Sequence, residues 1–244
     1  MAREEFPEKG KAIELIDVAL IGAASSVPVV GGLTGSVVDH ALNVRWTRRA
    51  SEWIKKLGED VDELIEKTDG LTPEAIVESE VFADTVTRAT FIALGEHREE
   101  KLRALRAAVV NGLLPGAPEE DIQMMMLSHI EALTPSHLCL LNLLHDPSVA
   151  YPNGTDGMVS SSHSHTVEST FGWDKSFYDQ LARDLAARGL IANGSLHGAM
   201  SAAGALQSQT TDAGKAFLRF ITAPGDQAPF LPDKDIDLPT GRVN

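Results

Sequence analysis

Apolar residues recur at spacings of three and four along most of the chain, which is the period of a helix with one buried face. The longest such pattern predicts a helix over residues 33–67, followed by the helix-ending pair Asp69-Gly70. Its apolar positions are Val38, Leu42, Trp46, Ala50, Trp53, Leu57, Val61 and Leu64. A shorter pattern predicts a helix over residues 11–24, and a break with Ser, Pro and Gly separates the two. The chain therefore begins with a predicted pair of helices.

The helical period continues through the middle of the chain. Thr72 can cap a helix and Pro73 suits its first position, so we expect a helix from there to about residue 111. The run Gly95-Glu96-His97 predicts a bend within it. After a linker rich in proline, a further helix is expected over residues 119–133. The helices before this linker predict a helical block over residues 1–115, and the helix after it connects this block to the rest of the chain.

From residue 134 the pattern becomes more varied. It predicts a short apolar helix to about residue 145, a loop over residues 146–170 and a helix over residues 173–188. A weak strand pair and a last helix, capped by Thr211, complete this part. The tail, residues 223–244, is rich in proline and is expected to be extended or disordered.

The order of these C-terminal elements resembles the second half of a winged-helix domain. In winged-helix regulators of the antibiotic-resistance type, a recognition helix ends in Gly-Leu-Ile, as Gly189-Leu190-Ile191 does here. A hairpin wing and a Thr-x-x-Gly helix start then follow, matched here by Thr211 and Gly214. We therefore expect a mostly α fold, with a winged-helix-like block over residues 119–222 that contains a small β-hairpin.

Composition and charge exclude several classes of protein. Hydrophobic residues make up 43% of the chain, which is too many for a disordered protein. The single cysteine, Cys139, cannot form an internal disulfide, and its apolar neighbours predict a buried thiol. The chain holds 35 Asp and Glu against 21 Lys and Arg, a net charge of -14. That balance argues against broad nucleic-acid binding, which depends on basic contacts to phosphate.

The charged residues of the predicted recognition helix bear on the alternative that the chain binds DNA. Its candidate contacts are Lys175, Arg183 and Arg188. Three aspartates on the same helix, at positions 174, 179 and 184, cancel their charge, and the expected wing has no Lys or Arg. A winged-helix DNA-binding transcriptional regulator therefore remains an alternative hypothesis rather than the leading one.

The longest uncharged stretch, residues 18–38, is followed by a basic one. The uncharged stretch is long enough to span a bilayer, but its many small residues and lack of aromatic residues argue against insertion. The following surface candidates are Arg45, Trp46, Arg48, Arg49, Trp53, Lys55 and Lys56. Two interpretations remain open. These residues bind an anionic membrane surface or a partner, or they belong to a helical hairpin whose tryptophans are packed in the core.

A search for catalytic residues gives little. His163 and His165 alternate as zinc ligands on a strand would, but they lie in a serine-rich segment that is typical of a solvated loop. The chain contains no nucleophile elbow, phosphate loop, His-Glu-x-x-His motif or dinucleotide fingerprint. The sequence therefore favours a protein without enzymatic activity or cofactor, and a metal-dependent enzyme built on these histidines is the least favoured alternative.

The remaining titratable positions of the helices have structural interpretations. Glu96, His97 and Glu99 are expected to form a charged helix surface. Lys101 is expected to be exposed, opposite the buried face of the same helix. His129 shares an apolar stripe and is expected to be a hydrogen-bonded core histidine.

Two segments resemble a group of uncharacterised bacterial proteins. These are residues 99–111, EEKLRALRAAVVN, and residues 133–138, LTPSHL. The layout of the chain also resembles the abortive-infection alpha family, with an N-terminal helix pair, a central helical block and a Thr-x-x-Gly-x-x-Phe element. That resemblance implies a role in bacterial defence against phage and carries over no catalytic residue.

Together these features predict a non-enzymatic interaction protein, a phage-defence accessory or effector that contacts a protein partner or a membrane surface. The acidic residues Glu4, Glu5 and Glu8 do not match the basic start of a signal peptide. We therefore expect a cytoplasmic protein, peripheral to the inner membrane if the membrane version holds.

Overall fold

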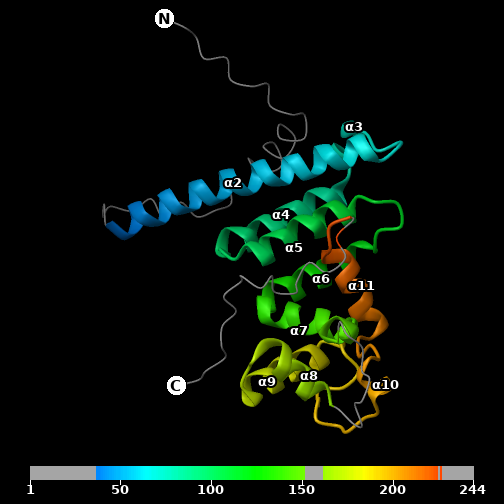
Figure 1. Cartoon of the computed structure of the whole chain (residues 1–244). Coiled ribbons are helices and arrows are strands. Elements are labelled where there is room, and N and C mark those ends of the chain that lie inside the picture. The colour runs from blue at the N-terminus through cyan, green and yellow to red at the C-terminus, as the bar shows by residue number, and fades with distance from the viewer. Residues whose placement is uncertain (1–36, 152–161, 225, 227–244) are drawn as a thin grey trace, which may run out of the picture. The chain divides into compact units, whose positions relative to one another are not determined.

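The computed structural model describes residues 37–151, 162–224 and 226, and the side chains from residue 48 onward (Figure 1). The helix predicted over residues 11–24, nearly all of the uncharged stretch and most of the C-terminal tail lie outside the described residues. The chain divides into two compact units, residues 1–127 and 128–244. In the described part of both units the regular elements are helices, which confirms the mostly α fold.

Three helices form the body of the first unit. They are α2 (Val37–Lys67), α4 (Glu80–Gly95) and α5 (Glu99–Gly112), which lie side by side in Figure 1. The apolar stripe predicted for α2 is buried at Trp53, Leu57, Val61 and Leu64. The predicted end of this helix at Lys67 is confirmed, and Gly70 adopts the left-handed conformation just beyond it.

Polar contacts set the register of these three helices. Arg49 of α2 donates to the carbonyl of Leu94 near the end of α4, and Trp53 donates to Thr90 one turn earlier. Helix α2 therefore runs antiparallel to α4. It runs parallel to α5, because Lys56 pairs with Glu99 at the start of α5 and Asp60 pairs with Arg106 further along.

The single helix expected from residue 73 to 111 is three helices in the structure. The first is α3 (Pro73–Val77), where Thr72 accepts a hydrogen bond from the backbone N–H of Ala75 as predicted. Ser79 then caps α4 in the same way, and the predicted bend at residues 95–97 separates α4 from α5. Helix α6 (Glu120–Ala132) follows, close to its expected bounds.

In the second unit, helix α7 (Pro135–His145) is the central element. It is packed against α8 (His163–Phe171), α9 (Lys175–Ala187), α11 (Asp212–Ile221) and the 3₁₀ turn η1 (Pro147–Ala150). The fully buried side chains of the second unit include Leu138, Leu141, Tyr178 and Phe217. Cys139 is also buried and free, as predicted.

The prediction of a loop over residues 146–170 is wrong for its last part. Helix α8 begins at His163, where the hydroxyl of Ser162 accepts from the backbone N–H of His165. It ends at Gly172, which adopts φ 65° and has the left-handed conformation that glycine tolerates best. Thr166 and Val167 are buried, so tertiary packing stabilises a helix in a segment whose composition is typical of a loop.

The structure does not support the β-hairpin of the expected winged-helix block. In the described residues the strand pair is reduced to one isolated antiparallel bridge, between Ile191 and Thr210. The short helix α10 (Ala202–Ala205), capped by Ser201, lies within the segment expected to form the wing. Alanine favours a helix over a strand, and the surrounding glycines and serines give little strand propensity.

Candidate functional site

The basic residues of α2 are the candidate interaction surface from the sequence. Arg48 and Lys55 are exposed, each with 73% of its side chain accessible, and each lies near an acidic residue one turn away. Those i,i+4 distances are 3.7 Å for Arg48–Glu52 and 3.9 Å for Lys55–Glu59. Such exposed pairs contribute only a few tenths of a kcal/mol, about 0.3–0.5, and are easily exchanged for other partners.

Two other basic residues of α2 have partners on α4 and α5 within the first unit. Arg49 is half-buried and its Nη1 donates to the carbonyl oxygen of Leu94 at 3.3 Å. Lys56 Nζ lies 3.1 Å from Glu99 Oε1. Arg49 therefore contacts α4 and Lys56 pairs with α5 at the surface, and both leave less uncompensated positive charge than the sequence indicates.

The two tryptophans of the predicted surface have different outcomes. Trp53 is a core residue, only 4% exposed, and its Nε1 donates to Thr90 Oγ1 at 3.0 Å. It does not contribute to an exposed surface. The side chains of Trp46 and Arg45 lie outside the described residues.

Helix α2 is much longer than the helices that cover it. Its 31 residues span about 46 Å, against about 24 Å for the 16 residues of α4 and about 21 Å for the 14 of α5. Arg49 already lies beside Leu94, the second-last residue of α4. The backbone of residues 37–48 therefore extends past the ends of α4 and α5, as Figure 1 shows.

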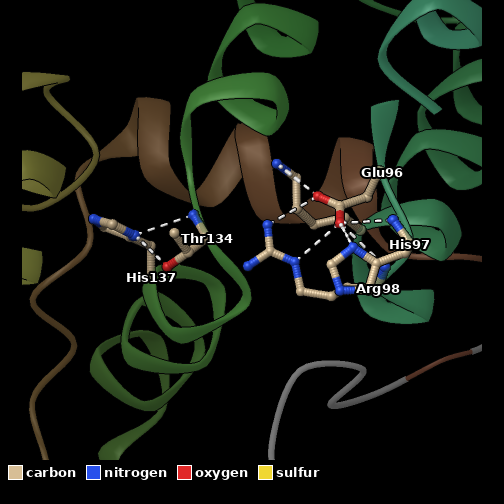
Figure 2. Close-up of polar contacts among 6 residues, drawn as sticks. Glu96, His97, Arg98, Thr134 and His137 are labelled. Atoms are coloured by element: carbon tan, nitrogen blue, oxygen red, sulfur yellow. Dashed lines mark hydrogen bonds and ion pairs between the residues drawn. The ribbon is translucent and has the colours of Figure 1, made fainter. Parts of the chain in front are cut away.

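A buried ionic cluster lies at the turn between α4 and α5 (Figure 2). Glu96 Oε1 accepts from the backbone N–H groups of His97 and Arg98 at 2.8 and 3.1 Å and from Arg98 Nε at 3.0 Å. Its other oxygen accepts from Arg98 Nη2 at 2.9 Å and lies 3.3 Å from Lys101 Nζ. The expectation that Glu96 and Lys101 lie on the surface is wrong, because both side chains are more than nine-tenths buried.

The cluster is not suited to proton transfer. Burial alone would raise the pKa of Glu96, but the hydrogen bonds from Arg98 and from the backbone of His97 outweigh it and lower the pKa to about 2. A carboxylate with that pKa is a poor general base at neutral pH. What the cluster does is join the end of α4 to the first turn of α5.

In the second unit, His137 belongs to the start of α7. Its Nδ1 accepts from the backbone N–H of Thr134 at 3.1 Å and lies 2.8 Å from the Thr134 hydroxyl (Figure 2). Because Nδ1 is an acceptor, we assign the proton to Nε2, which lies 3.4 Å from Asp184 Oδ2 on α9. Thr134, His137 and Asp184 follow one another as the hydroxyl, imidazole and carboxylate of a catalytic triad do. The contacts between Thr134 and His137 are also those of a helix capping box.

The other histidines give no convergent site. His163 and His165 lie two residues apart in the first turn of α8, where the former is buried and the latter exposed. His129 is half-buried and has its ring edge toward Phe217, with the centroids 5.7 Å apart. Its Nδ1 has no hydrogen-bond partner, so the expected hydrogen bond is absent at that atom. Within residues 37–151 and 162–224, no three His, Cys, Asp or Glu side chains are grouped to hold a metal ion.

The candidate DNA contacts are all exposed at the outer side of α9 and its C-terminal cap. These residues are Lys175, Arg183 and Arg188. The Nη2 of Arg183 donates to Gln180 at 3.1 Å, and Gln180 in turn donates to Asp184. Asp184, one of the three aspartates that balance the charge of this helix, therefore lies within the same surface network.

Comparisons with known proteins do not identify a family for this chain: no family model, curated protein or solved structure matches it. Among the helices that the structure describes, none combines the length and the apolar character needed to cross a bilayer.

Proposed function

We propose that this chain is a non-enzymatic interaction protein that binds a protein partner through the projecting N-terminal part of α2, residues 37–48. The observation that carries the proposal is the length of α2, of which only the C-terminal part lies alongside α4 and α5. A helix that extends past the helices packed against it can serve as a surface for another chain, and the apolar period of the α2 sequence continues into the extension at positions 38, 42 and 46.

The setting proposed for this interaction is bacterial phage defence, with the chain as a cytoplasmic accessory or effector. That setting rests on the resemblance of the sequence to the abortive-infection alpha family. The resemblance supplies no residue roles for the contact surface.

Partners other than membrane lipid are favoured by the contacts of the basic residues. Arg49 contacts α4, Lys56 is paired with Glu99 of α5, and Arg48 and Lys55 each have an acidic neighbour. Binding to anionic lipid depends on uncompensated basic charge near the surface, at about 1 kcal/mol per residue. Trp53 is also buried and cannot anchor at a lipid interface. A protein surface, which can match both the apolar and the charged positions of the helix, suits α2 better.

A phage-challenge assay tests the proposal. We expect a strain that carries the chain to resist a phage panel, and the double variant Arg45→Glu/Arg48→Glu to lose that protection. The same double variant should lose the proteins that co-purify with the wild-type chain. Because Arg48 is exposed, the single variant Arg48→Glu should keep a melting temperature close to that of the wild type, and the melting temperature of the double variant is measured beside it.

The matched control is Arg103→Glu, which reverses an exposed arginine on α5, away from the projecting helix. It should retain both protection and the co-purifying proteins. If the double variant protects and co-purifies as well as this control, the proposal is wrong. Co-sedimentation with phosphatidylglycerol vesicles separates the membrane version: binding that the double variant loses would replace the protein partner by a lipid surface.

A further inference from the structure

His163 is a buried imidazole that no hydrogen bond satisfies. It is the first residue of α8, it is 3% exposed, and neither ring nitrogen has a hydrogen-bond partner. A neutral imidazole tolerates such a place at a moderate cost, whereas a charged ring without an acceptor costs several kcal/mol. The position therefore accepts only one of the two protonation states of histidine.

The titratable groups around α8 have partners other than His163. On α8 itself Glu168 accepts from the Tyr178 hydroxyl at 2.6 Å, and on α9 Asp179 lies 2.7 Å from His197 Nε2. At η1, Asp146 accepts from Ser148. On α7, His137 contacts Thr134 and Asp184, and His145 contacts Thr210. The pKa of His163 is lowered by burial, with no charged group contributing.

A few polar contacts hold α8 in place. The backbone N–H of Ser164 donates to the carbonyl of Leu196 at 2.9 Å, and the hydroxyls of Tyr151 and Thr166 are 2.7 Å apart. The Tyr178–Glu168 hydrogen bond joins the helix to α9. Beneath these contacts lie the fully buried Val167 and Tyr178. Opening of α8 would therefore expose apolar surface that the closed unit hides.

We propose that His163 is an acid-sensitive switch that releases α8 from the second unit when its imidazole is protonated. In the opened form the ring is solvated and binds a proton freely, while in the closed form it cannot find an acceptor. The closed form is fully favoured above the ordinary histidine value of 6.5 and loses ground as the pH falls below it. This inference concerns the second unit and does not depend on the function proposed for α2.

Hydrogen exchange of the full-length chain at pH 7.5 and pH 5.5, corrected for intrinsic exchange rates, measures the switch. A single proton bound only in the opened form raises the opening constant up to about tenfold between these two values. We expect that rise at the amides of residues 163–171 and no comparable rise at those of α7. An equal rise in α7 and α8, or no rise in α8, would overturn the proposal, and the wild-type protein is enough to show either result.

Two variants assign the effect to one ring. His163→Leu should make the exchange of α8 independent of pH between 5.5 and 7.5. The same replacement at His165, which is exposed two residues further along the helix, should leave the tenfold rise in place. A rise that persists in His163→Leu, or disappears in His165→Leu, would show that His163 is not the group responsible.

Discussion

Lys101 Nζ lies 3.3 Å from Glu96 Oε2, and both side chains are buried where the chain turns from α4 into α5. The N-cap residue of α5, Arg98, makes no capping hydrogen bond of its own with its side chain. Glu96 instead accepts from the backbone N–H groups before the helix, and its charge attracts the lysine in the first turn. One carboxylate thus satisfies the amides of the turn and neutralises a buried ammonium group.

Glu96→Gln should strongly destabilise the first unit. The substitution keeps the size of the side chain but removes the carboxylate charge that lies 3.3 Å from the buried ammonium group of Lys101, and breaking such a buried ion pair costs about 3 kcal/mol or more of unfolding free energy. Urea denaturation followed by the hydrogen exchange of α5 measures the change. The matched control is Glu66→Gln, an exposed position on α2, which should change the free energy by no more than about 0.5 kcal/mol.

The first unit should also lose stability in acid through the same carboxylate. The pKa of Glu96 is about 2 in the folded chain against 4.5 for the free side chain, so the unfolded chain binds the proton first. The stabilisation is complete above pH 4.5 and declines as the pH falls from there toward 2, by up to about 3 kcal/mol. Urea midpoints measured between pH 6 and pH 2.5 test this. Glu96→Gln should flatten the profile, and an unchanged slope would contradict the assignment.

The sequence contained a signal for the burial of Lys101 that its charge obscured. Position 101 lies four residues before Leu105, a buried residue of α5, so the helical period places both on the same face. An isolated lysine there would be costly, and the period alone does not show that Glu96 supplies a counter-charge from outside the helix. Burial of charge depends on a tertiary partner, which a periodic pattern cannot specify.

The positions of most helices followed from local pattern, whereas α8 and the expected hairpin did not. The end of α2 and the cap at Thr72 depend on neighbouring residues, so sequence alone located them. Helix α8 depends on packing against α7 and α9, and its serine and histidine content concealed it. At Ile191 the local pattern predicted a strand that the structure does not continue. One bridge forms there, and α10 lies in the segment expected to form the hairpin.

Trp53 and Thr90 should behave as a coupled pair. Trp53→Phe removes the donor to Thr90 Oγ1 and leaves a buried hydroxyl unsatisfied, which should cost about 1–3 kcal/mol beyond the loss of ring area. Thr90→Val in the same background removes that hydroxyl and should recover part of the loss. A double-mutant cycle from urea denaturation gives the coupling, and a value near zero would mean that the hydrogen bond does not stabilise α2 against α4.

Gly214 is the glycine of the Thr-x-x-Gly element, and its surroundings in the first turn of α11 show why a glycine stands there. The backbone of Leu190 approaches so closely that a Cβ atom at position 214 would lie 2.0 Å from its carbonyl oxygen. The same carbonyl accepts from the backbone N–H of Thr211 at 3.1 Å, and the Thr211 hydroxyl donates to Gly189 at 2.5 Å. The glycine therefore lets the start of α11 close against the end of α9 and its following turn.

Gly214→Ala should destabilise the second unit by about 3 kcal/mol, because the clash is with backbone and no side chain can move to relieve it. Gly198→Ala is the matched control, since a Cβ atom there meets nothing within 4 Å. Thermal denaturation compares the melting temperatures of the two variants, and hydrogen exchange of α11 identifies the unit that opens. Equal melting temperatures would mean that Leu190 and α11 separate at little cost, and the close approach would then not be what the glycine serves.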